Sequence, residues 1–168
     1  MRIRINLEQI TFFRFMVIFL KPYWKWWLFY CFLVISVFCW VSLYVFRYLW
    51  IYYHILLVFG VFFSFAIHEY MHIFSMKMCY KGWVILEYSL YKISVIPEFT
   101  IEKAHLFLIA LSGPLTCLFI SCIILLFNYY LHYFILTILS CIYFFHIINL
   151  IPPFGDGKML LKSLISQR

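Results

Sequence analysis

Four long apolar runs dominate this sequence and restrict what it can fold into. They cover approximately residues 24–46, 49–76, 104–127 and 130–150, and each is long enough to cross a hydrocarbon core, which takes about 20 residues of α-helix. The chain is 67% hydrophobic, whereas soluble domains are roughly 45–50% apolar. We therefore predict an all-α polytopic membrane protein with four transmembrane helices.

Positive charges alternate between the segments that flank these runs. Of the thirteen Lys and Arg residues, five lie at or before the start of the first run, one follows it, four lie between the second and third, none between the third and fourth, and three in the tail. Cytoplasmic connections are enriched in Lys and Arg, so we expect both termini and the 77–103 connection to be cytoplasmic. The net charge of +7 is scattered and does not form one basic face, so no nucleic acid partner is predicted.

No linker rich in Pro, Gly or Ser and no internal repeat divides the chain. We predict a single membrane domain, 1–168, with an interfacial segment and the first transmembrane helix in 1–48, the core in 49–160 and a cytoplasmic tail in 161–168. The richness in Phe, Ile and Tyr indicates an AT-rich genome, and we expect a bacterial cell membrane.

The connection between the second and third runs is too long for a tight turn and too apolar for a solvated loop. Polar and β-favouring residues alternate over 83–96, which is typical of strands. We predict a small β-hairpin at the cytoplasmic interface, ended by Pro97, with Thr100 as the N-cap of the third transmembrane helix.

The second apolar run contains HEYMH at 68–72. Positions i and i+4 share a helix face, so His68 and His72 converge at the spacing that zinc needs, and Glu69 is a candidate general base. A carboxylate within a span costs roughly 2.5–3.5 kcal/mol, and such residues are usually functional. The alternative is a helix end that reaches the headgroups, where these side chains are tolerated.

A catalytic zinc site typically has three protein ligands, and Asp156 is the candidate for the third. It lies in NLIPPFGDGKML, residues 149–160, after a run that ends on the same side of the membrane as HEYMH. The prolines and glycines of this segment imply broken helix around Asp156, which is tolerated at membrane depth only where it lines a protein cavity. A simple Asp-Gly turn is the alternative.

These motifs together resemble the site-2 protease family of intramembrane zinc metalloproteases. The matching stretches are HEYMH at 68–72, NLIP…DG at 149–157 and SGP at 112–114, so the likeness covers about residues 50–160. It implies a core of three transmembrane helices. It also implies one Zn²⁺ per chain held by three ligands: His68, His72 and Asp156.

The resemblance further implies that Glu69 polarises the attacking water, and that Asn149 and Pro152 shape the substrate channel or position the substrate backbone. One feature departs from the family pattern. The family usually has one more residue in this loop, often Leu before the Asp, whereas Gly155 precedes Asp156 here. We expect glycine to give the shorter loop backbone angles that leucine cannot adopt.

The remaining histidines and the cysteines carry weaker signals. His146 lies three residues before Asn149 and shares its helix face, so both a core histidine and a residue that supports a metal ligand remain open. The six cysteines lie almost entirely in apolar runs, where thiols behave as small hydrophobes. No disulfide or cysteine-based zinc site is predicted.

The predicted activity is hydrolysis of a peptide bond in a membrane-embedded or membrane-associated substrate, such as a small peptide precursor, a signal-peptide remnant or an anchored regulator. An edge strand of the hairpin would pair with the extended substrate. The alternative is a non-catalytic zinc-binding scaffold or peptide-binding relative. A metal transporter is poorly supported, because only Glu69 and Asp156 are acidic residues at membrane depth.

Overall fold

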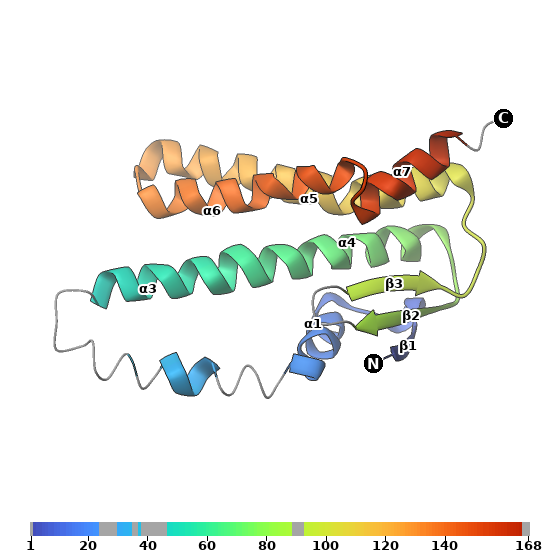
Figure 1. The fold of residues 1–168 in the computed structure, drawn as a ribbon, viewed down its shortest axis with the longest axis horizontal. Coiled ribbons are helices and arrows are strands. Elements are labelled where there is room, and N and C mark those ends of the chain that lie inside the picture. Colours follow the sequence, from blue (N-terminus) through green and yellow to red (C-terminus); the bar gives the residue numbers. More distant parts are fainter. Residues whose placement is uncertain (1, 24–29, 35–36, 38–46, 89–92, 166–168) are drawn as a thin grey trace.

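Long helices make up most of the protein, and a small sheet lies beside α4 near one end (Figure 1). The computed structural model describes residues 2–23, 30–34, 37, 47–88 and 93–165. Within this part, three stretches are long and apolar enough to cross a membrane: Ile51–Cys79, Lys103–Leu131 and Phe134–Ile165. The predicted first transmembrane helix at 24–46 falls mostly outside the described residues.

The first of these stretches is a continuous helix made of three segments. They are α3 (Arg47–Ile55), a π-helical segment η3 (Leu56–Phe62) and α4 (Phe63–Cys79). The helix ends at Tyr80, whose backbone is extended and whose N–H donates to the Met76 carbonyl at 2.8 Å. HEYMH therefore lies inside a regular helix, close to the end where the sheet packs.

The next two stretches form an antiparallel pair. α5 (Lys103–Leu131) contains Pro114, and the chain then reverses to α6 (Phe134–Phe145), a 3₁₀ segment η4 (His146–Leu150) and α7 (Gly155–Ile165). The expectation that Thr100 caps α5 is wrong. The N-cap is two residues later, at Glu102, whose backbone is extended and whose N–H donates to the Tyr80 hydroxyl at 2.8 Å.

The predicted hairpin forms, but within a sheet of three strands. β1 (Arg2–Asn6), β2 (Trp83–Tyr88) and β3 (Ile93–Pro97) are antiparallel in the order β1-β2-β3, and β3 ends at the predicted Pro97. The additional strand, β1 at the N-terminus, was not predicted. Its two arginines form ion pairs with the neighbouring strand and the segment after β3, at 2.7 Å from Arg2 to Glu87 and 2.6 Å from Arg4 to Glu98.

A buried apolar cluster attaches the sheet to α4 and to the short helix α1 (Phe12–Leu20). Its fully buried members include Leu7, Phe15, Ile73, Val84 and Leu86. Full burial of a large aliphatic or aromatic side chain stabilises a fold by roughly 1.5–3 kcal/mol. The sheet is thus a fixed part of the fold beside the HEYMH helix.

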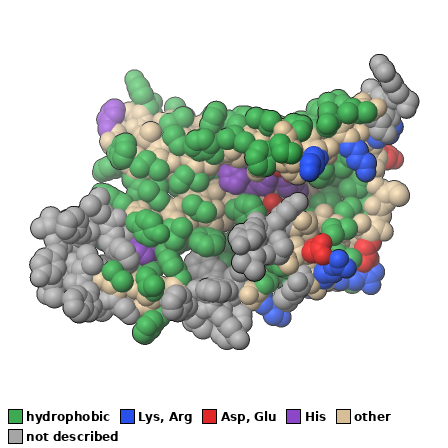
Figure 2. All heavy atoms as spheres, in the orientation of Figure 1, with side chains coloured by type: hydrophobic (Ala, Val, Ile, Leu, Met, Phe, Trp, Pro, Cys, Tyr) green, Lys and Arg blue, Asp and Glu red, His purple; other side chains and the backbone are tan. Residues whose placement is uncertain are grey.

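Side chains of different character occupy different parts of the surface. Apolar groups cover the long helices, whereas Lys, Arg, Asp and Glu gather toward one end (Figure 2). Phe119 on α5 and Phe134 on α6 are 66% and 77% exposed, which suits contact with lipid and not with water.

Candidate metal centre

Three side chains from two distant parts of the chain converge between α4 and α7. The Nε2 atom of His68 lies 3.0 Å from Asp156 Oδ2, that of His72 lies 3.3 Å from Asp156 Oδ1, and the two Nε2 atoms are 3.2 Å apart. Ligand atoms around a tetrahedral zinc ion are separated by about 3.3 Å, given metal–ligand distances near 2.0–2.1 Å. The three atoms therefore have the spacing that one such ion requires.

The hydrogen bond on the far side of the His72 ring determines its protonation. Nδ1 lies 2.7 Å from the Ile109 carbonyl oxygen on α5. A carbonyl only accepts hydrogen bonds, so Nδ1 carries the proton and Nε2 has its lone pair directed toward His68 and Asp156. This is the arrangement that orients metal-ligating histidines in proteins, and the donor set fits a zinc ion.

Gly113 on α5 allows the close approach of α5 to the two histidines. A Cβ atom at this position would lie 2.7 Å from His72 Nε2 and 2.9 Å from the His68 carbonyl oxygen. Real Cβ atoms essentially never approach other atoms that closely. The glycine of the SGP motif at 112–114 is therefore needed because no side chain fits between α5 and the two histidines.

Asp156 reaches the centre by a different route from the one expected. The irregular segment lies at 151–154, before the aspartate, and Asp156 itself is in the first turn of α7. The expected role of Gly155 is wrong, because among the described glycines only Gly82 has a positive φ. The glycine of this segment that has no room for a side chain is Gly157, where a Cβ would lie 2.6–2.7 Å from backbone atoms of residues 150–152.

A cavity of about 330 Å³ adjoins the three converging side chains. Glu69, His72 and Asp156 line it together with Ser94 and Val95 of β3. The predicted general base and two predicted ligands thus share one cavity with β3, one of the two outer strands of the described sheet.

Asn149 and Pro152 lie apart from this cavity. Asn149 is half-buried in η4 and Pro152 is exposed in the segment that follows, and neither is among the residues that line it. Their predicted contact with substrate stays a prediction without a described site.

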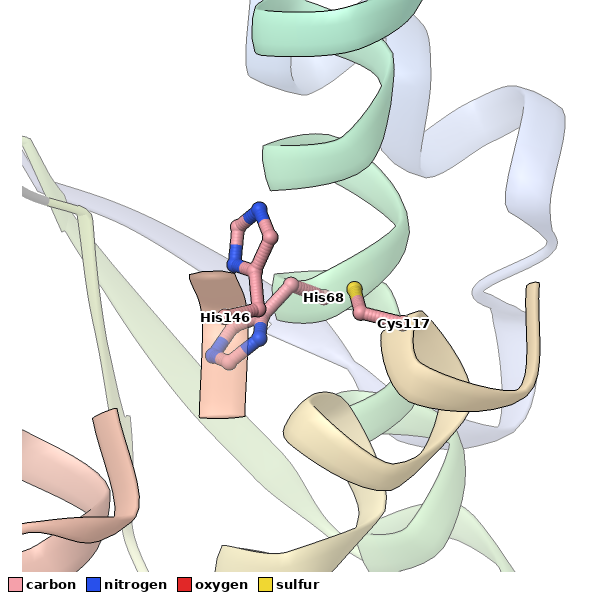
Figure 3. A group of neighbouring side chains, drawn as sticks. All are labelled: His68, Cys117 and His146. Carbon is pink, nitrogen blue, oxygen red and sulfur yellow. The ribbon is translucent and has the colours of Figure 1, made fainter. Parts of the chain in front are cut away.

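Two further side chains, Cys117 and His146, lie next to His68 (Figure 3), and the His68 and His146 ring centroids are 4.9 Å apart. His68, Cys117 and His146 each offer one donor atom, and these atoms lie within 4.8 Å of one another. Sequence reasoning treated Cys117 as a small hydrophobe and left His146 open. The available signal was spacing on α5, because Cys117 is one turn after Gly113 and shares its face toward α4.

Comparison with known proteins leaves the likeness to site-2 proteases resting on these motif residues. No protein-family model, no curated protein and no solved structure matches the chain.

Proposed function

We propose that this protein is a zinc-dependent intramembrane metalloprotease of the site-2 type. It acts in a bacterial cell membrane with both termini cytoplasmic and hydrolyses a peptide bond in a membrane-embedded or membrane-associated substrate. The observation that carries the proposal is the convergence of His68, His72 and Asp156, with Glu69 on the adjoining cavity.

The donor set favours zinc over the common hard cations. Two imidazole nitrogens and one carboxylate are a ligand set of catalytic zinc sites, whereas Mg²⁺ and Ca²⁺ are bound by oxygen ligands. Zinc supplies Lewis-acid polarisation of a carbonyl group and activation of water.

Glu69 carries out the proton transfers in this proposal. Its carboxylate accepts a proton from the attacking water and passes it to the nitrogen of the leaving amine. Two observations support this role: Glu69 is on the same helix as both histidines, and it lines the cavity beside them.

The substrate segment lies extended along β3 in this proposal. A transmembrane helix hides its peptide bonds in its own hydrogen bonds, so it must unwind before attack. β3 is one of the two edge strands of the described sheet, and its residues Ser94 and Val95 line the cavity. Added-strand pairing would supply main-chain hydrogen bonds to the unwound segment.

Zinc content of the detergent-purified protein is the first test. We expect about one zinc ion per chain, lost in His68→Ala and Asp156→Ala and kept in Glu69→Gln. Zinc that survives Asp156→Ala in a chain that also carries Cys117→Ser would show that Asp156 is not the third ligand. No zinc after loading of the wild type would overturn the proposal.

Cleavage is tested with the protein in liposomes that contain a set of transmembrane peptides, with products identified by mass spectrometry. We expect cleavage by the wild type and none by Glu69→Gln, whose metal centre remains. Peptides that bind with zinc present but are never cut would point instead to the scaffold function.

A further inference from the structure

We propose a second metal site in this protein, selective for a thiophilic metal ion and formed by His68, Cys117 and His146. One donor atom from each residue lies within 4.8 Å of the others (Figure 3). The residues come from α4, α5 and η4. Small side-chain movements bring atoms at this spacing to within the coordination distance of one ion.

The free nitrogen of His68 is the first observation that points to a ligand. His68 Nε2 lies 3.0 Å from the Asp156 carboxylate, which only accepts hydrogen bonds, so in this arrangement Nε2 carries the proton. Nδ1 then has a lone pair. It is buried in a side chain only 2% exposed, and it has no hydrogen-bond partner in the described chain. Such unpaired buried polar atoms are uncommon in native proteins.

The hydrogen bonds of His146 indicate that it too offers a lone pair. Ser64 Oγ donates its single proton to the Val61 carbonyl at 3.1 Å, so it accepts from His146 Nε2 at 3.0 Å. Nε2 of His146 is therefore protonated, and Nδ1 of the neutral ring is free to bind a metal ion.

Cys117 determines which metals the site prefers. Its sulfur is fully buried on α5, with the Ser64 carbonyl as a weak acceptor at 3.7 Å. A thiolate ligand selects soft ions such as Cu⁺ or Cd²⁺ over Mg²⁺ or Ca²⁺. Binding releases the thiol proton, and His146 is the one partly buried member of the three.

The two metal sites compete because they share His68. A neutral imidazole has one unprotonated nitrogen, so His68 binds an ion through Nε2 at the first site or through Nδ1 at the second, not both. A thiophilic ion would therefore weaken zinc binding at the first site. This competition rests on the proposed function, whereas the second site itself does not.

Cd²⁺ titration of the full-length protein tests the inference, with thiolate-to-metal charge-transfer absorption as the readout. The first site has only nitrogen and oxygen ligands, so this absorption reports on cysteine alone. A variant that keeps Cys117 and has serine at the other five cysteines should bind about one Cd²⁺ per chain with this absorption. A matched variant that keeps only Cys122, which is exposed on the same helix, should not.

The histidine ligands are tested in the same background. His146→Gln should weaken Cd²⁺ binding at least about tenfold, and saturating zinc should weaken it as well. No absorption with Cys117 alone, or equal affinity with and without His146, would overturn the second site. If the single-cysteine variant fails to fold, Cys117→Ser and Cys122→Ser in the natural chain are compared, and only the first should lose a Cd–thiolate site.

The two proposals fail separately. Cd–thiolate absorption at Cys117 without any zinc bound through Asp156 would leave the second site standing and remove the protease centre. Zinc bound through Asp156 without this absorption would leave the protease centre standing and remove the second site.

Discussion

At the scale of single residues, Gly113 has no room for a side chain beside the two histidine ligands. A methyl group there would lie 2.7 Å from His72 Nε2 and 2.9 Å from a backbone oxygen of α4. The backbone atom cannot move away cheaply, so we expect Gly113→Ala to displace His72 and to weaken zinc binding at least about tenfold. Zinc affinity, measured by competition with a chelator, checks this.

Gly60→Ala is the matched control, a second glycine replaced within the same set of packed helices. Its new Cβ would lie 2.7 Å from Ile142 Cδ1, which is the end of a flexible side chain and can rotate away. We expect zinc affinity to stay at the wild-type value. If both variants lose zinc equally, the effect is a general loss of packing, and the steric account of Gly113 fails.

Some residues of the candidate site could be predicted from the sequence, and others could not. His68 and His72 follow from the 3.6-residue helical period, which is local. Asp156 followed from topology, because two runs with the same direction end on one side. The lone pair on His68 Nδ1 could not be predicted, because it depends on the contact between His68 Nε2 and Asp156, which is distant in sequence. Cys117 was missed because an apolar setting explains a cysteine equally well.

At the scale of elements, a pair of serines joins α5 to α6 away from the metal centre. Ser121 and Ser140 are buried, their hydroxyl oxygens are 2.8 Å apart, and each hydroxyl also lies within hydrogen-bonding distance of the other residue's carbonyl oxygen, at 2.9 and 3.1 Å. We expect a double-mutant cycle with alanine to give a coupling of about 0.6 kcal/mol and no more than about 1.7 kcal/mol. Unfolding by SDS in mixed micelles measures it. Additive effects of the two alanines would show that the pair does not act as a unit.

The sheet shows why one element escaped prediction. β2 and β3 are neighbours in sequence and display the strand period together, whereas β1 pairs with a strand about eighty positions away, with Arg4 opposite Ile85. Arg2 and Arg4 were interpreted only as positive charges that mark the cytoplasmic side of the membrane. The alternation of Arg and Ile over residues 2–5 was the local sign of a strand.

The core beneath β1 gives this element a measurable contribution to stability. Leu7 follows the strand, is fully buried, and its N–H donates to the Gly82 carbonyl at 2.9 Å. We expect Leu7→Ala to lower the free energy of unfolding by about 2–5 kcal/mol. Val17→Ala on α1, whose side chain is 53% exposed, should change it by less than about 0.5 kcal/mol. A similar small loss at Leu7 would mean that the sheet is only loosely attached to α4.

At the scale of the whole molecule, the charged side chains gather toward one end of the long helices. Ion pairs from Arg2 and Arg4 lie with the sheet, whereas residues 104–157, which include the turn between α5 and α6, contain no Lys or Arg. Tyr129, Tyr130 and Tyr133 near that turn are 59–73% exposed, as expected for an aromatic belt at a membrane surface. The sheet is therefore expected on the cytoplasmic side and the turn on the outer side.

Labelling of single cysteines in whole cells tests this orientation. In a chain whose natural cysteines are replaced by serine, Tyr133→Cys should react with a membrane-impermeant maleimide in intact cells. Lys81→Cys, whose native side chain is 90% exposed near the sheet, should react only after the cells are permeabilised, because the reagent must cross the membrane to reach it. The reverse pattern would place the metal centre near the outer surface and exclude cytoplasmic substrates. Equal labelling from outside would show that the helices between these positions do not span the membrane.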